Sequence, residues 1–428
     1  MPTVSVIIPS YNHEKFVREC IQSVLDQTFR DFEVIITDDC STDRTAEIIE
    51  IFKDPRISFY QHSMNKGVSV TANDCLMHAS GKYVAWLSTD DAWYPEKLAV
   101  QVEYLEEHPE IAVVFGKVEW VDEFGNPMDE QFPYLNVFDV ENRNRHEWLR
   151  QFFMIGNCLS LPSSLVRREC FSEVGMFDPV FAGVPDLDLW VRICLKYDII
   201  ILDKKLIRNR WISNESNASG YTTGNVIRNR FEFRHILDHY LKINKPDELL
   251  MIFPDAIQYG TITTETIPYF LAHLAVASKL DYKMLWGMDV IHRLIQDEKI
   301  EQILEVQYGF SSLEFIKLIK QCDPFRLEER KLLLEQVDEK DRVINTLTEQ
   351  IAEKDRVINT FTEQVAEKDR VINTLTEQVV EKDLQIGELS NQIALDEQAL
   401  AGILNSRSWR AIQLFQKLKA LILPRREK

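Results

Sequence analysis

Short apolar segments alternate with amphipathic segments along the first 115 residues, and this alternation restricts the possible folds more than any other feature. The apolar segments are rich in β-branched residues and lie at 4–10, 33–39, 56–62, 83–89 and 111–121. Between them, apolar residues recur at the spacing of a helix with one buried face. Strands that are apolar on both faces need a cover on both faces. The sequence therefore predicts an α/β fold in which helices flank a mostly parallel sheet.

The charge balance excludes one class of partner. The 428 residues carry a formal net charge of -19. Binding of nucleic acid through its phosphates needs an excess of Lys and Arg, so we expect no nucleic-acid partner. Seven scattered cysteines without a CxxC pair favour a reducing compartment. We find neither a signal-peptide pattern nor an apolar run of about 20 residues, and we expect a cytoplasmic protein without a transmembrane helix.

Three further segments follow an α/β domain expected at 1–220. Helical spacing of apolar residues predicts a helical extension over 221–325. A 14-residue repeat at 339–380 predicts a coiled coil over 326–400, with Ile or Val at one seam position and Leu or Phe alternating with Lys at the other. This pattern favours a parallel homodimer. The alternative is a single charged helix without a partner, because Lys interrupts the seam in every second heptad.

The last segment, 401–428, reverses the charge of the chain. Its stretch 403–426 contains six basic residues and no acid. Trp409, Ile412, Phe415 and Leu418 can share one face of a helix. A basic amphipathic helix with Trp is typical of segments that lie on a membrane surface. Docking on the protein body or on another subunit is the alternative.

Two pairs of adjacent carboxylates follow predicted strands. Asp90 and Asp91 come at the end of 83–89, and Asp38 and Asp39 end 33–39. Adjacent carboxylates repel each other unless a positive charge neutralises them. Mg²⁺ or Mn²⁺ does so, and it leaves coordination positions for substrate phosphates. One pair can hold such an ion while the other accepts hydrogen bonds from a ribose or a base; a plain polar turn is the alternative for each.

Two other features provide candidate site residues. One lies near the same edge of the predicted sheet, and the other opens a helix. Tyr11 follows the first strand in "PSYN" and offers a stacking surface, unless it is only a surface tyrosine on a turn. Asp186 and Asp188 open an amphipathic helix before Trp190. Either of them can cap that helix. Either can also serve as a general base for an acceptor hydroxyl.

Taken together, these stretches resemble the inverting family-2 glycosyltransferases of the GT-A fold, of the type that builds bacterial surface polysaccharides. The resemblance covers about residues 2–215. Its opening block is "VSVIIPSYNHEKFVRECIQSVLDQTFRDFEVIITDDCSTDRTAEII", followed by "NKGVSVTAND" and "ASGKYVAWLSTDDAWYPEKLAVQVEYL". The acceptor-side block is "SSLVRRECFSEVGMFDPVFAGVPDLDLWVRI". The resemblance implies a Rossmann-like GT-A domain.

The resemblance also implies roles for individual residues. Tyr11 and Asp39 are expected to contact the nucleotide base, in a pocket that Pro9 and Asp38 line as well. Asp90 would meet the ribose or the metal, and Asp91 would ligate Mn²⁺ or Mg²⁺ beneath the diphosphate. Asp186 stands at the second position of the family's Glu-Asp motif and is the candidate base.

Three positions depart from the family pattern. Ser88 stands where the metal motif often begins with Asp, and Ala72 stands where an Arg often precedes the Asn matched by Asn73. Pro185 replaces the Glu of the Glu-Asp motif. The last replacement makes Asp188 a second candidate base.

The resemblance implies transfer of a sugar from a nucleoside-diphosphate sugar, with a UDP-sugar as the expected donor, to a glycan or lipid-linked acceptor. Such acceptors would place the enzyme at the inner face of the cell membrane. The alternative is a coiled-coil scaffold that binds a nucleotide sugar without transferring it. A nucleotidyltransferase is disfavoured, because "PSYNHEKF" after the first strand contains no glycine for a phosphate loop.

Overall fold

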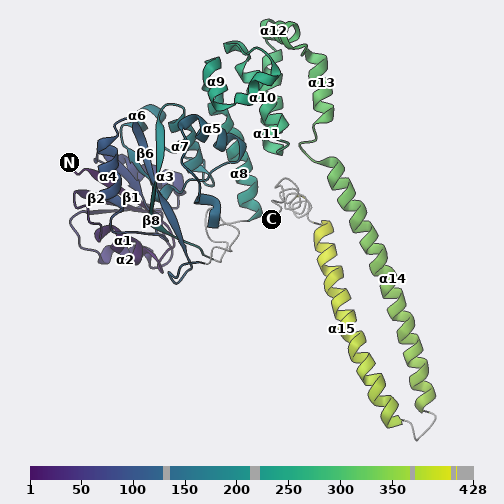
Figure 1. Cartoon of the computed structure of the whole chain (residues 1–428). Helices are drawn as coiled ribbons and strands as arrows, with labels where there is room; N and C mark the ends of the chain where they lie inside the picture. The colour runs from purple at the N-terminus through teal and green to yellow at the C-terminus, as the bar shows by residue number, and fades with distance from the viewer. Residues whose placement is uncertain (129–134, 213–221, 367–371, 406–410, 412–428) are drawn as a thin grey trace. The chain divides into compact units, whose positions relative to one another are not determined.

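The computed structural model describes residues 1–128, 135–212, 222–366, 372–405 and 411, and it divides into two compact units (Figure 1). The first unit is Met1–Pro324 and the second is Phe325–Lys428. The first unit holds the sheet and the helical region that follows it. The domain limit expected at 220 falls within 213–221, which lies outside the described residues.

The described part of the first unit contains one eight-stranded sheet with the order β3-β2-β1-β4-β7-β6-β8-β5. The strands are β1 (Val4–Ser10), β2 (Phe32–Asp38), β3 (Ile57–Gln61), β4 (Tyr83–Trp86), β5 (Ala92–Trp93), β6 (Ile111–Val121), β7 (Leu165–Arg167) and β8 (Asp198–Arg210). The first four strands along the chain are parallel neighbours, and β6 and β8 are also parallel. Only β7 and β5 run antiparallel to their neighbours. The predicted mostly parallel sheet of the GT-A type is confirmed.

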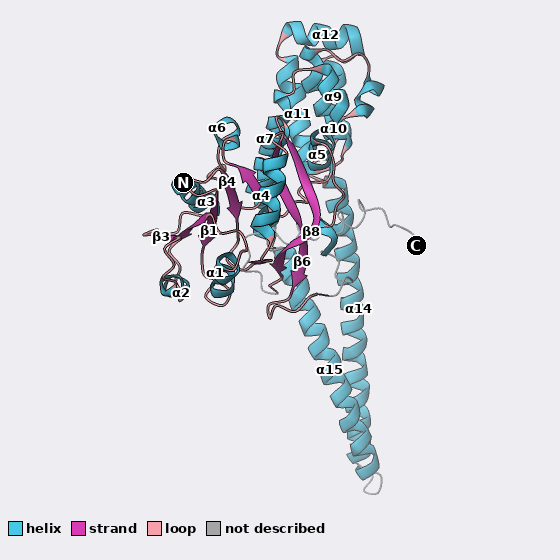
Figure 2. Ribbon diagram, turned by 60° about the vertical axis from the view of Figure 1, so that its left-hand side comes forward, coloured by secondary structure: helices cyan, strands magenta, loops and turns pink. Residues whose placement is uncertain are grey.

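Neighbouring residues of the central strands face two separate cores. Ile7 and Ile35 belong to a core with α3 (Val68–His78), α5 (Arg145–Met154), α6 (Cys170–Val174) and α7 (Pro185–Cys194). The residues on either side of each, such as Val6 and Val34, belong to a core with α1 (Val17–Leu25), α2 (Thr45–Ile51) and α4 (Lys97–Glu107). Side chains of a strand alternate between its faces, so a strand that is apolar at every position needs helices on both sides. Figure 2 shows helices on both sides of the magenta sheet.

The helical region continues the first of these cores. Its helices are α8 (Thr223–Ile236), η3 (Leu237–Lys242), α9 (Pro246–Ile252), η4 (Pro254–Tyr259), η5 (Thr264–Thr266), α10 (Ile267–Ala277), α11 (Asp281–Ile295), α12 (Glu298–Tyr308) and α13 (Ser312–Gln321). The hydroxyl of Tyr240 donates to the carbonyl of Leu149 at 2.7 Å. The buried Lys283 ammonium donates to the carbonyls of Phe153 and Met154. The helical extension is therefore packed on α5 as part of one compact unit.

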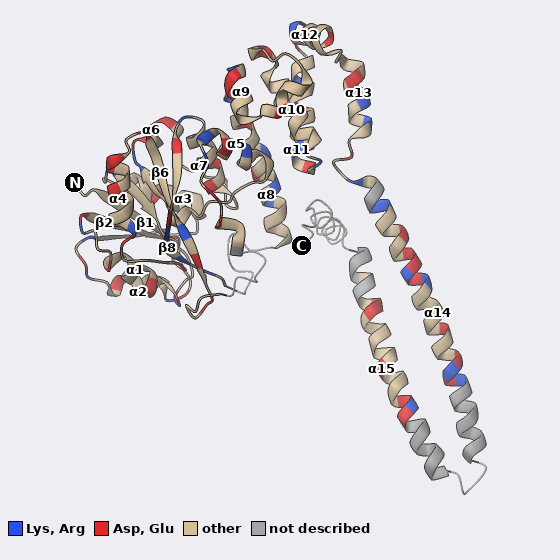
Figure 3. Cartoon of the chain, viewed as in Figure 1, with Lys and Arg blue, Asp and Glu red and all other residues tan. Residues whose placement is uncertain are grey.

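In the second unit, the repeat region forms α14 (Leu327–Ala366) and α15 (Ile372–Asn405), which contact each other. Figure 1 shows the two helices side by side and running in opposite directions, joined across 367–371. Acidic and basic residues are interspersed along the coloured part of α14 (Figure 3). The predicted helical character of this region is confirmed, while a homodimer through it stays a prediction. Of the basic helix expected at 401–428, residues 406–410 and 412–428 lie outside the described residues.

No helix within the described residues has the length and apolar composition needed to cross a membrane.

Candidate active site

The strands that precede the predicted site residues are adjacent in the sheet. In the register of β1 and β2, Ser10 lies beside Asp38, and β4 flanks β1 on its other side. The carboxyl ends of these three parallel strands therefore meet at one edge, where ligands of such sheets bind. Two long-range contacts close this edge. The Asn12 amide donates to the Ser41 hydroxyl at 2.9 Å, and His13 Nδ1 lies 2.6 Å from the Thr89 hydroxyl.

We use the name donor edge for Pro9, Tyr11, Asp38, Asp39, Asp90 and Asp91. The structure brings all six to the same end of β1, β2 and β4. The side chain of Tyr11 is 43% exposed, as a stacking surface for a ligand must be. Pro9 is the last residue but one of β1 and is partly buried.

The two carboxylates after β2 are held by the backbone around them. Asp38 is fully buried and accepts hydrogen bonds from the amide and hydroxyl of Ser41, at 2.8 and 2.5 Å. Asp39 is 3% exposed and accepts from the amides of Lys66 and Gly67, each at 2.8 Å. Asp38 thus shapes the turn after β2, and Asp39 fixes the residues that start α3.

A histidine that the sequence analysis did not single out stands between two acids. His62 Nδ1 lies 2.8 Å from Asp39 Oδ1, and its Nε2 lies 3.2 Å from Asp74 Oδ2. A neutral imidazole carries one N–H and can donate to only one of these carboxylates, whereas the protonated ring can donate to both. His62 follows β3 directly, so its place at the strand ends could have been read from the sequence.

The second pair lies between β4 and β5. Asp91 is 5% exposed, and its Oδ1 accepts from the Arg210 amide at 2.8 Å. Burial and the neighbouring charge of Asp90 raise the pKa of Asp91 well above its ordinary value. The buried Arg210 guanidinium donates to the Asp90 carbonyl at 2.8 Å, but it is also paired with Glu19 at 2.6 Å. The pair is therefore short of positive charge.

This shortage fits the predicted divalent cation. Two carboxylates at a strand end, with further ligands supplied by substrate phosphates, are the donor set that Mg²⁺ and Mn²⁺ accept. Within the described residues, no group of three or more His, Cys, Asp or Glu side chains could hold a metal ion. An ion bound by Asp90 and Asp91 would therefore need ligands from the substrate or from water.

The predicted bases lie on the first turn of α7, and we use the name acceptor side for this turn and its partners. Asp186 is half-buried; its Oδ2 accepts from Asn157 Nδ2 at 2.6 Å and its Oδ1 accepts from the Leu187 amide at 2.8 Å. Burial raises the pKa of Asp186 to about 6. A carboxylate with a pKa just below neutrality can take a proton from a hydroxyl group and still be ionised at pH 7. Asn157 was missed because it lies in a loop without a recognisable motif.

Asp188, the other predicted base, is engaged on both oxygens. Its Oδ2 accepts from Arg192 Nη2 at 2.6 Å, and its Oδ1 lies 2.7 Å from His239 Nε2. Burial alone would raise the pKa of Asp188, but the bond from His239 and the charge of Arg192 outweigh it and lower the pKa below its ordinary value. Arg192 also donates to the carbonyls of Val174, Gly175 and Met176. These bonds are typical of a structural ion pair.

Helix α3 touches both parts of the site. Its first turn starts at Gly67, which Asp39 holds. Further along, the Asn73 side chain donates to the Phe177 carbonyl at 2.8 Å and accepts from the Phe177 amide at 3.0 Å. Ser69 donates to the carbonyl of Phe181. The loop before α7 is thus tied to the helix that the donor edge positions.

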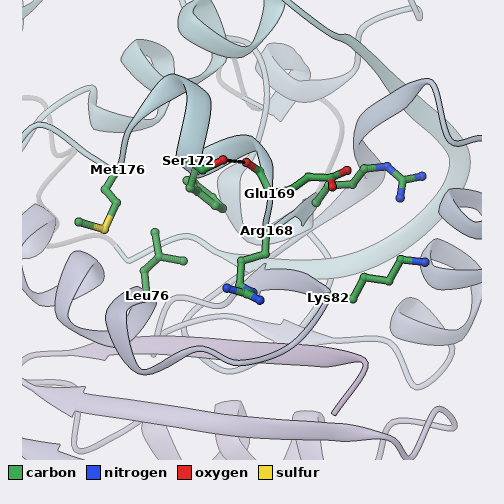
Figure 4. A pocket seen from close by; sticks show the side chains of 8 residues that line it. Leu76, Lys82, Arg168, Glu169, Ser172 and Met176 are labelled. Atoms are coloured by element: carbon green, nitrogen blue, oxygen red, sulfur yellow. Dashed lines mark hydrogen bonds between the residues drawn. The ribbon is translucent and has the colours of Figure 1, made fainter. Parts of the chain in front are cut away.

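The candidate site differs from two cavities found among the described residues of the first unit. One cavity of about 500 Å³ is lined by Leu76, Lys82, Arg167, Arg168, Glu169, Phe171, Ser172 and Met176 (Figure 4). Lys82 precedes β4 and Arg167 ends the antiparallel β7, so this cavity lies at the opposite edge of the sheet. Another, of about 490 Å³, lies between α8 and α11. Neither is lined by a residue of the donor edge or by Asp186.

The chain is similar to known glycosyltransferases. The sequence model of "Glycosyl transferase family 2" matches residues 5–173. The putative teichuronic acid biosynthesis glycosyltransferase TuaG of Bacillus subtilis is 40% identical over 231 residues, which cover 52% of this chain and 86% of that protein. An uncharacterised glycosyltransferase of Methanocaldococcus jannaschii is 30% identical over 221 residues, which cover 50% and 73%. The crystal structure of S. aureus TarS in complex with UDP-GlcNAc aligns with 20% identity and a TM-score of 0.49, covering 67% of this chain and 89% of that one.

The family match and the relative TuaG identify the chain as a glycosyltransferase. The chain belongs to glycosyl transferase family 2. The expectation drawn from the sequence blocks is therefore confirmed for the family and for the class of enzyme. The relatives named above match about half of the chain.

Proposed function

We propose that the protein transfers a sugar from a nucleoside-diphosphate sugar to an acceptor hydroxyl, with inversion at the anomeric carbon. The observation that carries this proposal is that the site contains two sets of carboxylates with different chemistry. Asp90 and Asp91 form one set and Asp186 is the other, and helix α3 contacts both parts of the site. At the donor edge, Asp90 and Asp91 share the buried Arg210 with Glu19, which leaves the pair short of positive charge. On the acceptor side, Asp186 has a raised pKa and accepts hydrogen bonds from two uncharged groups, the side-chain amide of Asn157 and the backbone amide of Leu187. Asp90 and Asp91 are therefore suited to binding a cation with its diphosphate, and Asp186 is suited to act as a general base.

The donor edge would bind the nucleotide. Tyr11 offers an exposed ring for stacking. Asp39, whose oxygens already accept from the Lys66 and Gly67 amides, would accept a further hydrogen bond from a base N–H through a remaining lone pair. Pro9 and Asp38 would line the same pocket, with Asp38 acting mainly through the turn that it holds. We expect a UDP-sugar as donor.

Asp91 and Asp90 would hold Mg²⁺ or Mn²⁺ beside the diphosphate. The bound ion would offset the negative charge that develops on the leaving nucleoside diphosphate. The contribution of the chain itself is to keep Asp91 in place through the Arg210 amide and to keep Arg210 occupied with Glu19.

Asp186 would remove the proton of the acceptor hydroxyl as that oxygen attacks the anomeric carbon. A positioned base contributes roughly 10²- to 10⁴-fold in rate. Attack from the face opposite the leaving diphosphate inverts the anomeric centre. Asp188 is the second candidate, but its bonds to Arg192 and His239 favour a structural role.

The acceptor would be a growing glycan or a lipid-linked glycan at the inner face of the cell membrane. The name of the relative TuaG supports an acceptor in cell-surface polysaccharide synthesis. The coiled-coil region would form a homodimer, and the basic segment 401–428 would contact the membrane surface. Flotation of the full chain and of a chain lacking 403–428 with anionic liposomes tests the last point, and equal flotation would contradict it.

The test of the proposed function combines binding and turnover. A screen of UDP-sugars by thermal unfolding, with and without Mn²⁺, should reveal a donor that raises Tm, because a ligand of the native state stabilises it. That donor should then be consumed with a suitable acceptor glycan. Binding without turnover on any acceptor would favour the non-catalytic scaffold. Absence of binding by every nucleotide sugar would contradict both.

A further inference from the structure

The acceptor side contains a buried carboxylate that neither the family match nor the predicted motif includes. Glu232 lies on α8, beyond the matched residues 5–173, and its side chain is 1% exposed. Its oxygens accept from the amides of Ala182 at 2.9 Å, Gly183 at 2.9 Å and Val184 at 2.8 Å. These three residues directly precede α7, whose second residue is Asp186.

The physical reason for this contact lies at the start of α7. The first amides of a helix have no partner within it, and they carry partial positive charge. Pro185 brings neither an amide hydrogen nor a carboxylate to this turn, and the helix has no side-chain cap of its own. Glu232 therefore supplies, from another helix, the acceptors for the three amides that lead into α7, in addition to the carboxylates of Asp186 and Asp188 in its first turn. A carboxylate is seldom buried without such bonds, because its desolvation is costly.

Gly183 faces α8 at this contact. A Cβ atom at Gly183 would overlap the end of the Asn229 side chain, one turn before Glu232 on α8, and would lie 3.1 Å from Arg228 Nε, so these side chains would have to move. Arg228 lies 3.6 Å from Glu232, but its side chain is 33% exposed, so the three amides are the main partners of the buried carboxylate. The sequence of this turn thus permits the contact in which Glu232 takes part.

We propose that Glu232 is a positioning residue for Asp186: it fixes the turn that carries the base and places a second negative charge beside it. The inference deepens the proposed function and rests on it. Asp186 itself faces Asn157 and the Leu187 amide, while Asp188, further along α7, is turned to Arg192 and His239. Burial is the main cause of the raised pKa of Asp186, and the charge of Glu232 adds a smaller effect that raises this pKa further.

The test compares Glu232→Gln with Glu248→Gln. Glu248 lies on α9 and pairs with Arg145 at 3.2 Å, and Arg145 donates to the carbonyls of Cys194 and Leu195. The control therefore removes the same charge from the same helical region, at the end of α7 opposite to Asp186. Loss of the charge at Glu232 favours the ionised form of Asp186, so the pKa of Asp186 should fall. The pKa is measured by ¹³C NMR of aspartate carboxyl groups in the full chain, with Asp186→Asn identifying the resonance. Glu248→Gln should leave it unchanged.

Turnover gives the second measurement. In Glu232→Gln, kcat should fall about tenfold, because the base is less well oriented, while the KM of the donor should stay within about twofold. The acid limb of the kcat–pH profile should move to lower pH. Glu232→Asp, which keeps the charge, should recover part of kcat and return the limb toward its original position. A purely structural role of Glu232 would not move the limb.

A second pair of variants keeps the inference testable if Glu232→Gln does not fold. Gly183→Ala should lower kcat by pushing α8 away from the turn, and Gly183→Ala combined with Asn229→Ala should restore it, because the colliding amide is gone. If the pKa of Asp186 and kcat are unchanged in folded Glu232→Gln, the inference is wrong while the proposed function stands. If the titration shifts but the wild-type chain transfers no sugar, the positioning is right and the proposed function is wrong.

Discussion

At the donor edge, the carboxylates stand at or just after strand ends, and their partners lie in the adjoining turns or, for Asp91, at the end of strand β8. On the acceptor side, Asp186 depends on Asn157 and on the turn that Glu232 holds, and these partners come from a loop and from helix α8 outside the sheet. The first arrangement follows from the sheet topology alone. The second needs the helical region 222–324 to be packed in place. The two parts should therefore respond differently to substitution.

The largest effect is expected at the donor edge. Asp91→Asn should abolish detectable metal-dependent transfer, because the cation and the diphosphate lose a charged ligand. The fold should persist, since burial and Asp90 already disfavour the charge of Asp91 in the folded state. Transfer assays with graded Mn²⁺ and thermal unfolding measure the two outcomes.

The exposed Asp203→Asn, on β8, is the matched control for Asp91→Asn and should keep full activity. Wild-type transfer rates in Asp91→Asn would remove the metal assignment.

On the acceptor side, Asp186→Asn should lower kcat by roughly 10²- to 10⁴-fold with little change in the KM of the donor. Such a split between kcat and KM would separate the acceptor side from the donor edge. The wild-type enzyme should also lose kcat as the pH falls below about 6, because Asp186 acts only when ionised and its pKa is about 6.

Initial rates over a range of pH at saturating donor measure this decrease in kcat. A flat profile between pH 5 and 8 would shift the role of base away from Asp186, and unchanged turnover in Asp186→Asn would transfer it to Asp188.

Asp188→Asn should act on stability more than on chemistry. Loss of one partner leaves the buried Arg192 guanidinium without its carboxylate, and breaking a buried pair costs about 3–5 kcal/mol. Because the pKa of Asp188 is lowered in the folded state, its contribution is present above the unfolded pKa and is lost as the pH falls through the folded pKa. Urea unfolding at pH 7 measures the loss.

Asp186→Asn provides the contrast in the same unfolding experiment. Its carboxylate is disfavoured by burial, so its removal should leave stability nearly unchanged or raise it. If Asp186→Asn and Asp188→Asn lost the same free energy of unfolding, the assignment of Asp186 as the base and of Asp188 as a structural ion-pair residue would be contradicted.

The sequence could predict much of the donor edge and little of the acceptor side. Strand ends with Asp pairs, together with the parallel order of β2, β1 and β4, are enough to place Asp38, Asp39, Asp90 and Asp91 at one edge. The roles of Asp186 and Asp188 could not be separated in this way, because both are acids in the first turn of an amphipathic helix. Their difference comes from Asn157 on one side and from Arg192 and His239 on the other.

The sequence also could not predict the short strand β5 or the hydrogen bond between Arg210 and Asp91. Strand β5 has only two residues: Ala92 pairs with Arg208 of β8, and Trp93 pairs with Ile207. Two residues give no periodic signal in the sequence. Arg210 reads in the sequence as one more charged residue near a strand end. Its burial beside Asp90 and Asp91 follows only from the pairing of β8 with β5 and β6.

The smallest effect should be found at the link between the two parts. Asn73→Ala removes both hydrogen bonds to Phe177, and we expect a loss of about 1–3 kcal/mol in stability. If α3 transmits position from the donor edge to the acceptor side, the variant should also weaken the increase in acceptor affinity that bound donor causes.

Isothermal titration of acceptor, with and without UDP, measures this coupling. Asn142→Ala, which removes one exposed bond to the Ile201 amide, is the control and should leave the coupling intact. If Asn73→Ala loses stability but keeps the coupling, α3 would serve only to support the loop before α7, and the donor edge and the acceptor side would bind their ligands independently.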